Sequence, residues 1–345
     1  MSYERGIQAI RLQMPDRIPH TEYISHREFV KKLTGFDPLD PEQADMADRE
    51  MVRRLDFDLV WISCEPPVQG RMTNMGHAHW YDSEWKPDHI QCPFNDEEDA
   101  FRFDAVEEYG VMEHGELVKW LQAAHNDHKR RYPTAVCPGG HYNTIVSACI
   151  RTFGWDMFLR TAALDYERFD RVLESMFQFS MAHFRAWAET DIETFICHDD
   201  MVWTQGAIFH PNWYRRYVFP RYARLWAPLR EKGIKLLFCS DGNFTEFVDD
   251  LAQAGADGFI FEPLTDLAVI AERYGKTKAI VGNVDCRILT FGTRDQIVAE
   301  VKRCADIGRD LPGYFFAIGN HIPRNIPIEN VELYFELIDE LGRRG

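Results

Sequence analysis

The chain alternates between two patterns of hydrophobic positions. Short runs rich in β-branched and aromatic residues, such as residues 193–198, are followed by longer segments in which apolar residues recur every three or four positions. The first pattern is typical of buried β-strands and the second of amphipathic helices. Because the two alternate along most of the chain, the sequence predicts a parallel β/α architecture.

Eight segments fit the strand pattern, and helical segments lie between most of them. The predicted strands are Arg17–Tyr23, Phe57–Ser63, Thr134–Cys137, Glu193–His198, Lys235–Cys239, Gly258–Phe261, Lys278–Gly282 and Gly313–Ile318. The predicted helices are Trp155–Glu189, Pro211–Lys232, Phe244–Ala254, Leu267–Tyr274, Thr293–Ile307 and Pro327–Leu341. Eight strands connected in this way predict an α/β fold, a closed (β/α)8 TIM barrel with an N-terminal extension. We expect it to form a single domain over residues 1–345.

The connection after the second predicted strand is too long for a simple loop. Residues 64–132 include Trp80, Trp85 and an acidic run at 96–99, and a helical pattern covers residues 113–129. We interpret this segment as an inserted lid or as an excursion that contacts a partner.

Charge and composition exclude several classes of protein. The 345 residues are 45% hydrophobic and carry a formal net charge of −16. This charge repels phosphate groups, so neither a nucleic acid nor an anionic membrane is expected as a partner. Residues 1–16 lack the apolar core of a signal peptide, and no run reaches the roughly 18 apolar residues of a membrane span, so we expect a cytoplasmic protein. The eight cysteines form no CxxC pair, which argues against a disulfide framework or a zinc ribbon.

Polar side chains gather where the predicted strands end, which is where TIM barrels carry their catalytic residues. These positions hold His141, Tyr142, Asn143, His198, Asp199, Asp200, Cys239, Asp241, Glu262, Asn283, Asp285, Asn320 and His321. Each one alone could be a helix cap, a turn residue or a small buried thiol. So many at successive strand ends indicate a functional ring that binds a metal or performs acid/base catalysis.

Several local motifs resemble one family. They are Met14–Pro19, Thr73–His77, Gly154–Leu159, His198–Asp200 with Phe209–Pro211 and Tyr214, Cys239–Asn243, Gly282–Asp285, and Gly319–Pro323 with Pro327–Asn330. With these motifs the chain resembles the uroporphyrinogen decarboxylase superfamily over most of its length. The resemblance implies a (β/α)8 barrel and one of two activities. Some members decarboxylate the acetate arms of uroporphyrinogen, and others move methyl groups to or from a corrinoid carried by a partner protein.

The chain departs from the true decarboxylases at the loop after the first strand. Those enzymes carry an Arg-Gln-Ala-Gly-Arg stretch there, because a substrate with eight carboxylates needs clustered guanidinium donors. The matching residues 18–26 read Ile-Pro-His-Thr-Glu-Tyr-Ile-Ser-His and contain no arginine. The resemblance is therefore closer to the corrinoid-dependent methyltransferase branch.

The resemblance also implies a metal site. Relatives that act on thiols hold zinc with a His-x-Cys pair after one strand and a Cys after the last strand. Here the pair is replaced by Cys239-x-Asp241, and the last position falls at Asn320-His321. The set implied is a zinc ion on Cys239, His321 and either Asp241 or Glu262, with one position open for the substrate. The changed donors leave a second hypothesis open, a metal-free site that binds and protonates a small substrate with His198, Asp199 and Asp285.

The function predicted is that of an O-demethylase-like component, which transfers a methyl group from a small methyl donor, such as an aromatic ether, to a cobalamin-carrying partner. His198, Asp199 and Asp285 are the predicted catalytic residues. The predicted substrate-binding residues are His141, Tyr142, Asn143, Asp200, Trp203 and Asn283. The alternative is a decarboxylase or lyase that acts on a small carboxylate, and bound metal would separate the two because the family's decarboxylation needs none. A barrel that binds a ligand without turnover is the third possibility.

Overall fold

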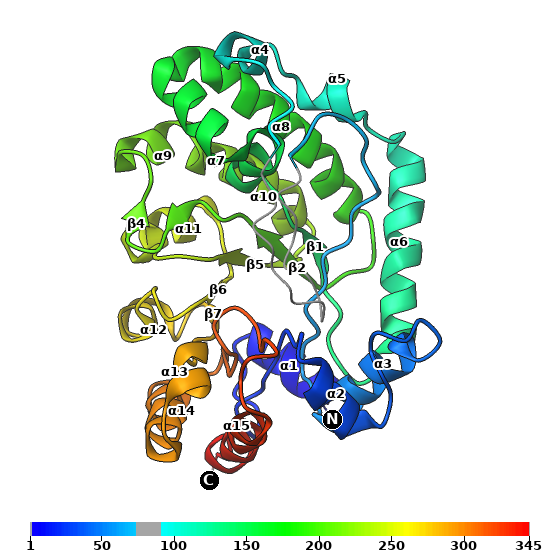
Figure 1. Cartoon of the computed structure of the whole chain (residues 1–345), viewed down its shortest axis with the longest axis vertical. Helices are drawn as coiled ribbons and strands as arrows, with labels where there is room; N and C mark the ends of the chain where they lie inside the picture. Colours follow the sequence, from blue (N-terminus) through cyan, green and yellow to red (C-terminus); the bar gives the residue numbers. More distant parts are fainter. Residues whose placement is uncertain (1, 74–90, 345) are drawn as a thin grey trace.

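The computed structural model describes residues 2–73 and 91–344, and it confirms the predicted TIM barrel (Figure 1). Six strands form a parallel sheet in the order β1-β2-β5-β6-β7-β8. They are β1 (Gly139–His141), β2 (Thr194–His198), β5 (Lys235–Ser240), β6 (Gly258–Phe261), β7 (Ala279–Val281) and β8 (Tyr314–Phe315). A two-stranded hairpin, β3 (Val202–Trp203) and β4 (Gly206–Ala207), follows β2.

Two further segments close the barrel without forming regular strands. The first segment (residues 17–24) pairs with the end of β8 and the residues after it through bridges from His20 to Phe316 and from Ile24 to Ile322. The second segment (residues 57–63) pairs with the residues before β1 through a bridge from Leu59 to Val136. The two segments are joined by the Asp58 N–H, which donates to the His20 carbonyl at 3.1 Å. The ring of eight is therefore complete.

The predictions of regular strands over 17–23, 57–63 and 134–137 were wrong in detail. Pro19 has no N–H to donate, and the His20 N–H is taken by the Asp58 carboxylate at 2.8 Å. The Thr21 hydroxyl likewise bonds to the Leu59 carbonyl at 2.7 Å. In this part of the barrel wall, hydrogen bonds from side chains thus replace the backbone hydrogen bonds of a regular sheet. The third strand begins only after Pro138, for the same lack of a donor.

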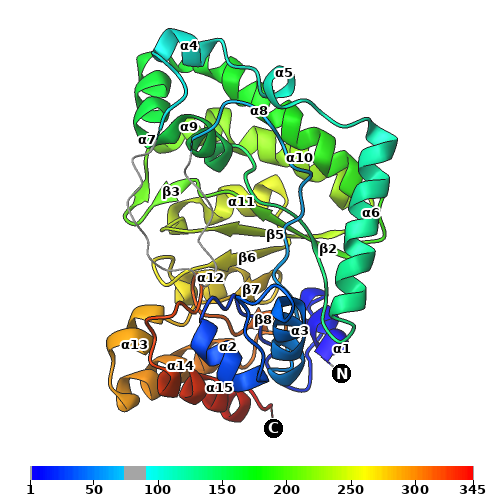
Figure 2. The same ribbon diagram turned by 45° about the vertical axis from the view of Figure 1, so that its right-hand side comes forward.

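The helices surround the sheet, as Figures 1 and 2 show from two directions. Those in the second half are α9 (Pro211–Tyr217), α10 (Phe219–Glu231), the 3₁₀ turn η1 (Thr245–Phe247), α11 (Val248–Ala254), α12 (Leu267–Tyr274), α13 (Cys286–Phe291), α14 (Arg294–Gly308) and α15 (Ile328–Leu341). The predicted helix over 155–189 is two helices, α7 (Val146–Leu164) and α8 (Tyr166–Trp187). They separate at Asp165, whose carboxylate caps α8 by accepting from the N–H groups of Glu167 and Arg168.

Helix α1 (Ser2–Ile10) precedes the first segment, and α2 (Arg27–Thr34) and α3 (Ala44–Arg54) connect the first segment to the second. Helix α1 closes the amino end of the barrel, where the Arg5 guanidinium lies 2.6 Å from the buried carboxylate of Asp58. Gly6 fits there because any Cβ would lie only 2.3 Å from the Asp58 carbonyl oxygen. The opposite end of the barrel is left for the site.

The described part of the long excursion forms α4 (Glu97–Phe101), α5 (Ala105–Tyr109) and α6 (His114–Arg131), which pack on α7 and α8 (Figure 1). It therefore adds a layer outside the barrel helices. Trp80, Trp85 and most of the Thr73–His77 motif lie outside the described residues. None of the helices within the described ranges has the length and apolar character needed to span a membrane.

Candidate functional site

Inward-facing positions along the strands pass from apolar to polar toward the carboxyl ends. Deep in the barrel, Ile196, Leu237 and Ile260 belong to one buried apolar cluster. Two residues further along β2 comes His198, and beyond β5 comes Asp241. Residues two apart in a strand point to the same face, so His198 and Asp241 point inward like the apolar residues that precede them. The barrel floor is thus hydrophobic and its mouth is polar.

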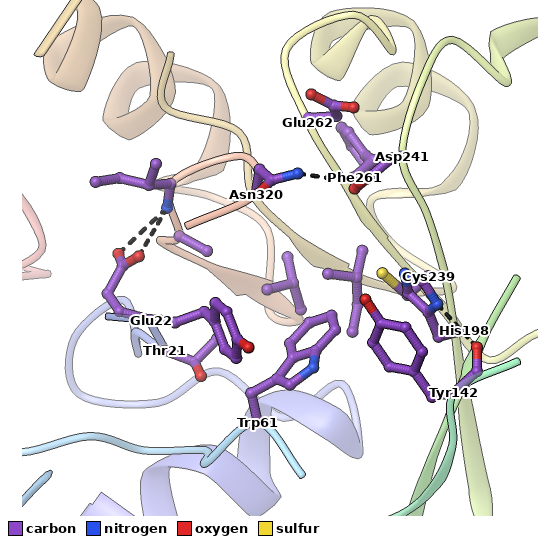
Figure 3. A pocket seen from close by; sticks show the side chains of 15 residues that line it. Thr21, Glu22, Trp61, Tyr142, His198, Cys239, Asp241, Phe261, Glu262 and Asn320 are labelled. Carbon is purple, nitrogen blue, oxygen red and sulfur yellow. Dashed lines mark hydrogen bonds between the residues drawn. The ribbon is translucent and has the colours of Figure 1, made fainter. Parts of the chain in front are cut away.

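A cavity of about 200 Å³ lies at this mouth (Figure 3). Its polar lining residues are Thr21, Glu22, His198, Cys239, Asp241, Glu262 and Asn320, and its aromatic ones are Tyr23, Trp61, Tyr142 and Phe261. Among the described lining residues there is no lysine and no arginine. The cavity is therefore acidic and partly aromatic.

His198, Asp200 and Asp241 form the cluster best suited to bind a metal, with one potential ligand atom from each lying within 4.8 Å of the others. The Nδ1 of His198 lies 2.9 Å from the carbonyl oxygen of Tyr142. A carbonyl can only accept, so Nδ1 carries a proton and Nε2 faces Asp200 at 3.3 Å. This is the arrangement in which a backbone carbonyl orients an imidazole for a metal. The donor set, one nitrogen and two carboxylates, fits zinc or a similar divalent ion.

Apart from His198 beside Asp200, the described carboxylates at the mouth have no basic partner. In the described chain no lysine or arginine forms an ion pair with Asp200, Asp241 or Glu262. Burial, together with the nearby charges of Asp200 and Glu262, raises the pKa of Asp241 to about 7. The Asn320 amide donates to Asp241 at 3.0 Å and holds its position. Clustered carboxylates of this kind favour a bound cation or a shared proton.

The ligand set expected from the resemblance is not assembled. Of Cys239, Asp241, Glu262 and His321, only Asp241 belongs to the cluster of three. Cys239 and Glu262 line the cavity, whereas His321 does not. The reason is the turn at Asn320, where φ is 94° and the Asn320 side chain takes the cavity position. Burial raises the pKa of the Cys239 thiol well above its usual range, so without a metal this residue is a neutral wall.

Asp199 is not brought to the cavity. It follows His198 directly, so it points to the other side of β2 and is fully buried there. Its carboxylate accepts from three consecutive N–H groups at the start of α7, those of residues 145–147, and from the Tyr222 hydroxyl at 2.6 Å. These bonds tie the first turn of α7 to β2 and α10. The structure thus corrects the expected catalytic position of Asp199 to one that supports the fold.

Asp285 and Asn283 also lie away from the cavity lining. Asp285 caps α13, and its carboxylate pairs with the Arg287 guanidinium at 2.6 Å. Burial opposes ionisation of Asp285, but the bonds from Arg287 outweigh it and lower its pKa. The Asn283 amide donates to the Thr265 carbonyl at 2.9 Å and accepts from Arg303 at 3.1 Å. Both side chains are occupied in holding loops.

The predicted substrate-binding residues are distributed over separate places. Tyr142 lines the cavity and stacks on His198 with ring centroids 4.1 Å apart, and Asp200 belongs to the metal-type cluster. His141 is buried behind the wall, 3.2 Å from Glu65, where burial lowers its pKa to about 3. Asn143 lines a separate small pocket. Trp203 lies on the β3–β4 hairpin, is 53% exposed and contacts Trp155.

The sequence prediction gave no role to two cavity residues of the first segment, Glu22 and Tyr23. Figure 3 shows the Glu22 carboxylate turned to the backbone of Ile318, whose N–H it accepts at 3.1 Å. The regular spacing of a parallel ladder would give that N–H to the Thr21 carbonyl instead. Burial raises the pKa of Glu22 to about 8. The signal in the sequence is the one carboxylate of the predicted strand Arg17–Tyr23, but nothing local indicates its partner.

The sequence matches the model of the family described as uroporphyrinogen decarboxylase (URO-D) over residues 1–341. The chain belongs to this family. It is 29% identical over 206 residues to the uroporphyrinogen decarboxylase of Syntrophotalea carbinolica, an alignment that covers 59% of this chain and 58% of that enzyme. To a uroporphyrinogen decarboxylase of Thermus thermophilus it is 30% identical over 188 residues, or 54% of this chain and 53% of that one. The chain thus spans only a little over half the length of these curated relatives.

A methyltransferase from Methanosarcina mazei has a similar structure, with a TM-score of 0.68, 17% identity and 98% of both chains covered. This similarity confirms the fold of the URO-D family member over nearly its whole length. The family match confirms the resemblance inferred from the motifs.

Proposed function

We propose that the chain is a corrinoid-dependent methyltransferase, the O-demethylase-like component that takes a methyl group from a small donor and transfers it to cobalamin on a partner protein. The observation that carries the proposal is the cavity lining, which combines carboxylates and aromatic rings without a lysine or arginine among its described residues. A tetrapyrrole with eight carboxylates would meet Asp241 and Glu262 there without guanidinium partners. Burying unpaired like charges is strongly unfavourable.

The size of the cavity suits a small group around the methyl that is transferred. About 200 Å³ is less than the roughly 300–1,000 Å³ typical of sites for drug-sized ligands. Trp61, Tyr142 and Tyr23 offer ring faces and edges on one side, against which a methyl or phenyl ether would pack. The fold that this chain has in common with a methyltransferase is compatible with the proposed reaction.

His198, Asp200 and Asp241 would hold a divalent ion, for which we propose zinc. When bound, such an ion supplies a Lewis acid for the heteroatom that leaves the methyl group. Hydrogen bonds within the chain hold these three ligand residues in position. The Tyr142 carbonyl orients His198, the Asn320 amide orients Asp241, and the Asp241 N–H donates to Asp200 at 2.9 Å.

The second candidate is decarboxylation of a small carboxylate, which the names of the relatives at 29–30% identity favour. In a metal-free site His198 would bind the substrate through Nε2, because Nδ1 is held by the Tyr142 carbonyl. Asp199 and Asp285 are held elsewhere by their own hydrogen bonds. The acidic lining opposes this alternative, since Asp241 and Glu262 would repel the substrate carboxylate.

The decisive assay follows methylcobalamin formation by absorbance when the protein is mixed with cob(I)alamin and a series of methyl ethers. A parallel assay measures coproporphyrinogen formation from uroporphyrinogen. We expect methyl transfer and no coproporphyrinogen. Asp241→Asn should abolish transfer and Asp266→Asn should not, because Asp266 caps α12 from an exposed position and Asn caps equally well. Enzymatic formation of coproporphyrinogen would overturn the proposal.

A further inference from the structure

The cavity at the barrel mouth adjoins a second, larger chamber. This side chamber has a volume of about 480 Å³ and shares four lining residues with the cavity, namely Glu22, Tyr23, Trp61 and Tyr142. Its other walls come from the second segment and from α3 and α6. The side chamber therefore lies between the barrel wall and the outer helices.

Between the cavity and the side chamber, the first and second segments separate from each other. Their last contacts are the Asp58 N–H to the His20 carbonyl and the Thr21 hydroxyl to the Leu59 carbonyl. Beyond these bonds no backbone hydrogen bond joins the described residues 22–24 to residues 60–63. A regular parallel pair would be joined by evenly spaced bonds to its end. The wall is thus split near the mouth, and Tyr23 and Trp61 flank the split.

The side chamber is mainly apolar. Met51 and Val52 face it from α3, and Val60 and Ile62 face it from the second segment. Glu22 at the junction is held by the Ile318 N–H and the Tyr334 hydroxyl, and its raised pKa of about 8 keeps this carboxyl neutral at pH 7. The junction therefore presents aromatic rings and an uncharged acid. Moving an uncharged apolar group from water into this junction is therefore favourable.

The far end of the side chamber is polar. Asp48 is occupied by the Tyr132 hydroxyl and by Arg131 at 3.2 Å. His128 also lines the side chamber, and its buried Nδ1 has no hydrogen-bond partner among the described residues. Burial and the nearby Arg131 lower the pKa of His128, so its ring is neutral. A neutral imidazole at this end of the side chamber suits a hydroxyl or ether group of a ligand.

From the shared lining residues and the split in the wall we infer that the two spaces connect and that the side chamber binds the non-reacting part of the methyl donor. The inference rests on the proposed function and narrows its substrate class to elongated, uncharged O-methyl compounds. The methyl end would lie beside Asp241 in the cavity, and an apolar body would pass between Tyr23 and Trp61. A polar end group would reach His128.

The first test measures binding alone and needs no methyl transfer. Phenol, 4-ethylphenol and 4-butylphenol stand in for the demethylated product, and their dissociation constants are measured by calorimetry. Burying each methylene should tighten binding about fourfold, or about 250-fold from phenol to 4-butylphenol. Equal dissociation constants for the three phenols would overturn the inference.

Two substitutions fill the side chamber from opposite sides, Val52→Trp from α3 and Val60→Phe from the second segment. Each should leave the dissociation constant of phenol unchanged. Each should also remove most of the gain in affinity that 4-butylphenol has over phenol. Val106→Trp, at a 36% exposed position of α5, is the matched control and should keep the full gain. Thermal denaturation of each variant checks that it folds. If both folded variants bind 4-butylphenol as tightly as the unsubstituted protein does, the side chamber is not the site.

The second test uses the corresponding methyl ethers with cob(I)alamin. Longer para-alkyl chains should lower KM about as much as they tighten phenol binding and should change kcat little, because the chain is remote from the reacting carbon. One possible outcome is binding that depends on the side chamber but no methyl transfer from any ether. This outcome would overturn the proposed function but not the class of ligand proposed for the side chamber. Methyl transfer that is insensitive to chain length would overturn the inference alone.

Discussion

The two sides of the cavity are built on different principles. On one side, β2 and β5 form a continuous ladder in which His198 pairs in register with Cys239. On the other side, the first and second segments are joined by a few bonds, several of which come from side chains. The regular wall positions side chains by alternation alone, whereas the irregular wall depends on partners far away in the sequence. The comparison teaches that the face to which a side chain points can be inferred from its place in the sequence on the regular wall only.

The largest expected effect concerns the outer side of the regular wall. Asp199→Ala should lower the free energy of unfolding by about 3–5 kcal/mol, because three buried N–H groups of α7 and the Tyr222 hydroxyl lose their acceptor. Chemical denaturation measures it. Asp285→Ala, which removes a partly exposed helix cap, should cost only about 1 kcal/mol. Equal losses would mean that Asp199 is not the structural residue described above.

Glu22, in the irregular wall, should make the stability of the protein depend on pH. Glu22 has a pKa of about 8 in the folded protein and an ordinary value of 4.5. Between these values the folded state binds more protons than the unfolded state, so stability falls as pH rises from about 4.5 to about 8. Glu22→Gln keeps an acceptor for the Ile318 N–H and removes this term. The unsubstituted protein should therefore lose a few kcal/mol more than the variant does over this range.

Denaturation curves at several pH values measure that difference, with Asp266→Asn as the control that should follow the unsubstituted protein. Asp58 has a raised pKa of about 7 and also contributes to the total pH dependence. Only the difference between the Glu22 variant and the unsubstituted protein therefore reports on the irregular wall. Parallel curves for these two proteins would contradict the assignment of a neutral Glu22.

A smaller effect is expected where the regular wall meets the cavity. Asp241→Asn should change the free energy of unfolding by less than about 1 kcal/mol, since it removes a charge that has no basic partner and is crowded by Asp200 and Glu262. Zinc affinity, measured by competition with a chelating dye, should fall about 10- to 100-fold or more. Retention of full zinc affinity would exclude the cluster of His198, Asp200 and Asp241 as the metal site.

The smallest effect is expected at Cys239. Cys239→Ser conserves the volume of a buried residue and should change stability by no more than about 1 kcal/mol. Because Cys239 lies outside the cluster of three, the zinc content measured by mass spectrometry should be unchanged. Loss of zinc from this variant would restore the ligand set implied by the family resemblance.

Sequence periodicity located the residues of the regular wall, although it could not assign their roles. His198, Asp199 and Asp200 follow one strand and were predicted together as parts of one site. The pleat sends Asp199 to the opposite face, and only the position of α7 and Tyr222 behind it reveals its partners. In the same way, the turn at Asn320 exchanges the expected position of His321 for that of its neighbour.

The sequence by itself determined the barrel, the family and the acidic character of the mouth. These depend on local alternation, motif spacing and composition, which each segment carries independently of its neighbours. Only the tertiary structure decided which carboxylates gather around His198, which are consumed by caps, and where the wall divides to join the side chamber. The physical reason is that a hydrogen-bond partner from a distant segment, such as Asp58 for the His20 N–H or Glu22 for the Ile318 N–H, leaves no mark in the local pattern.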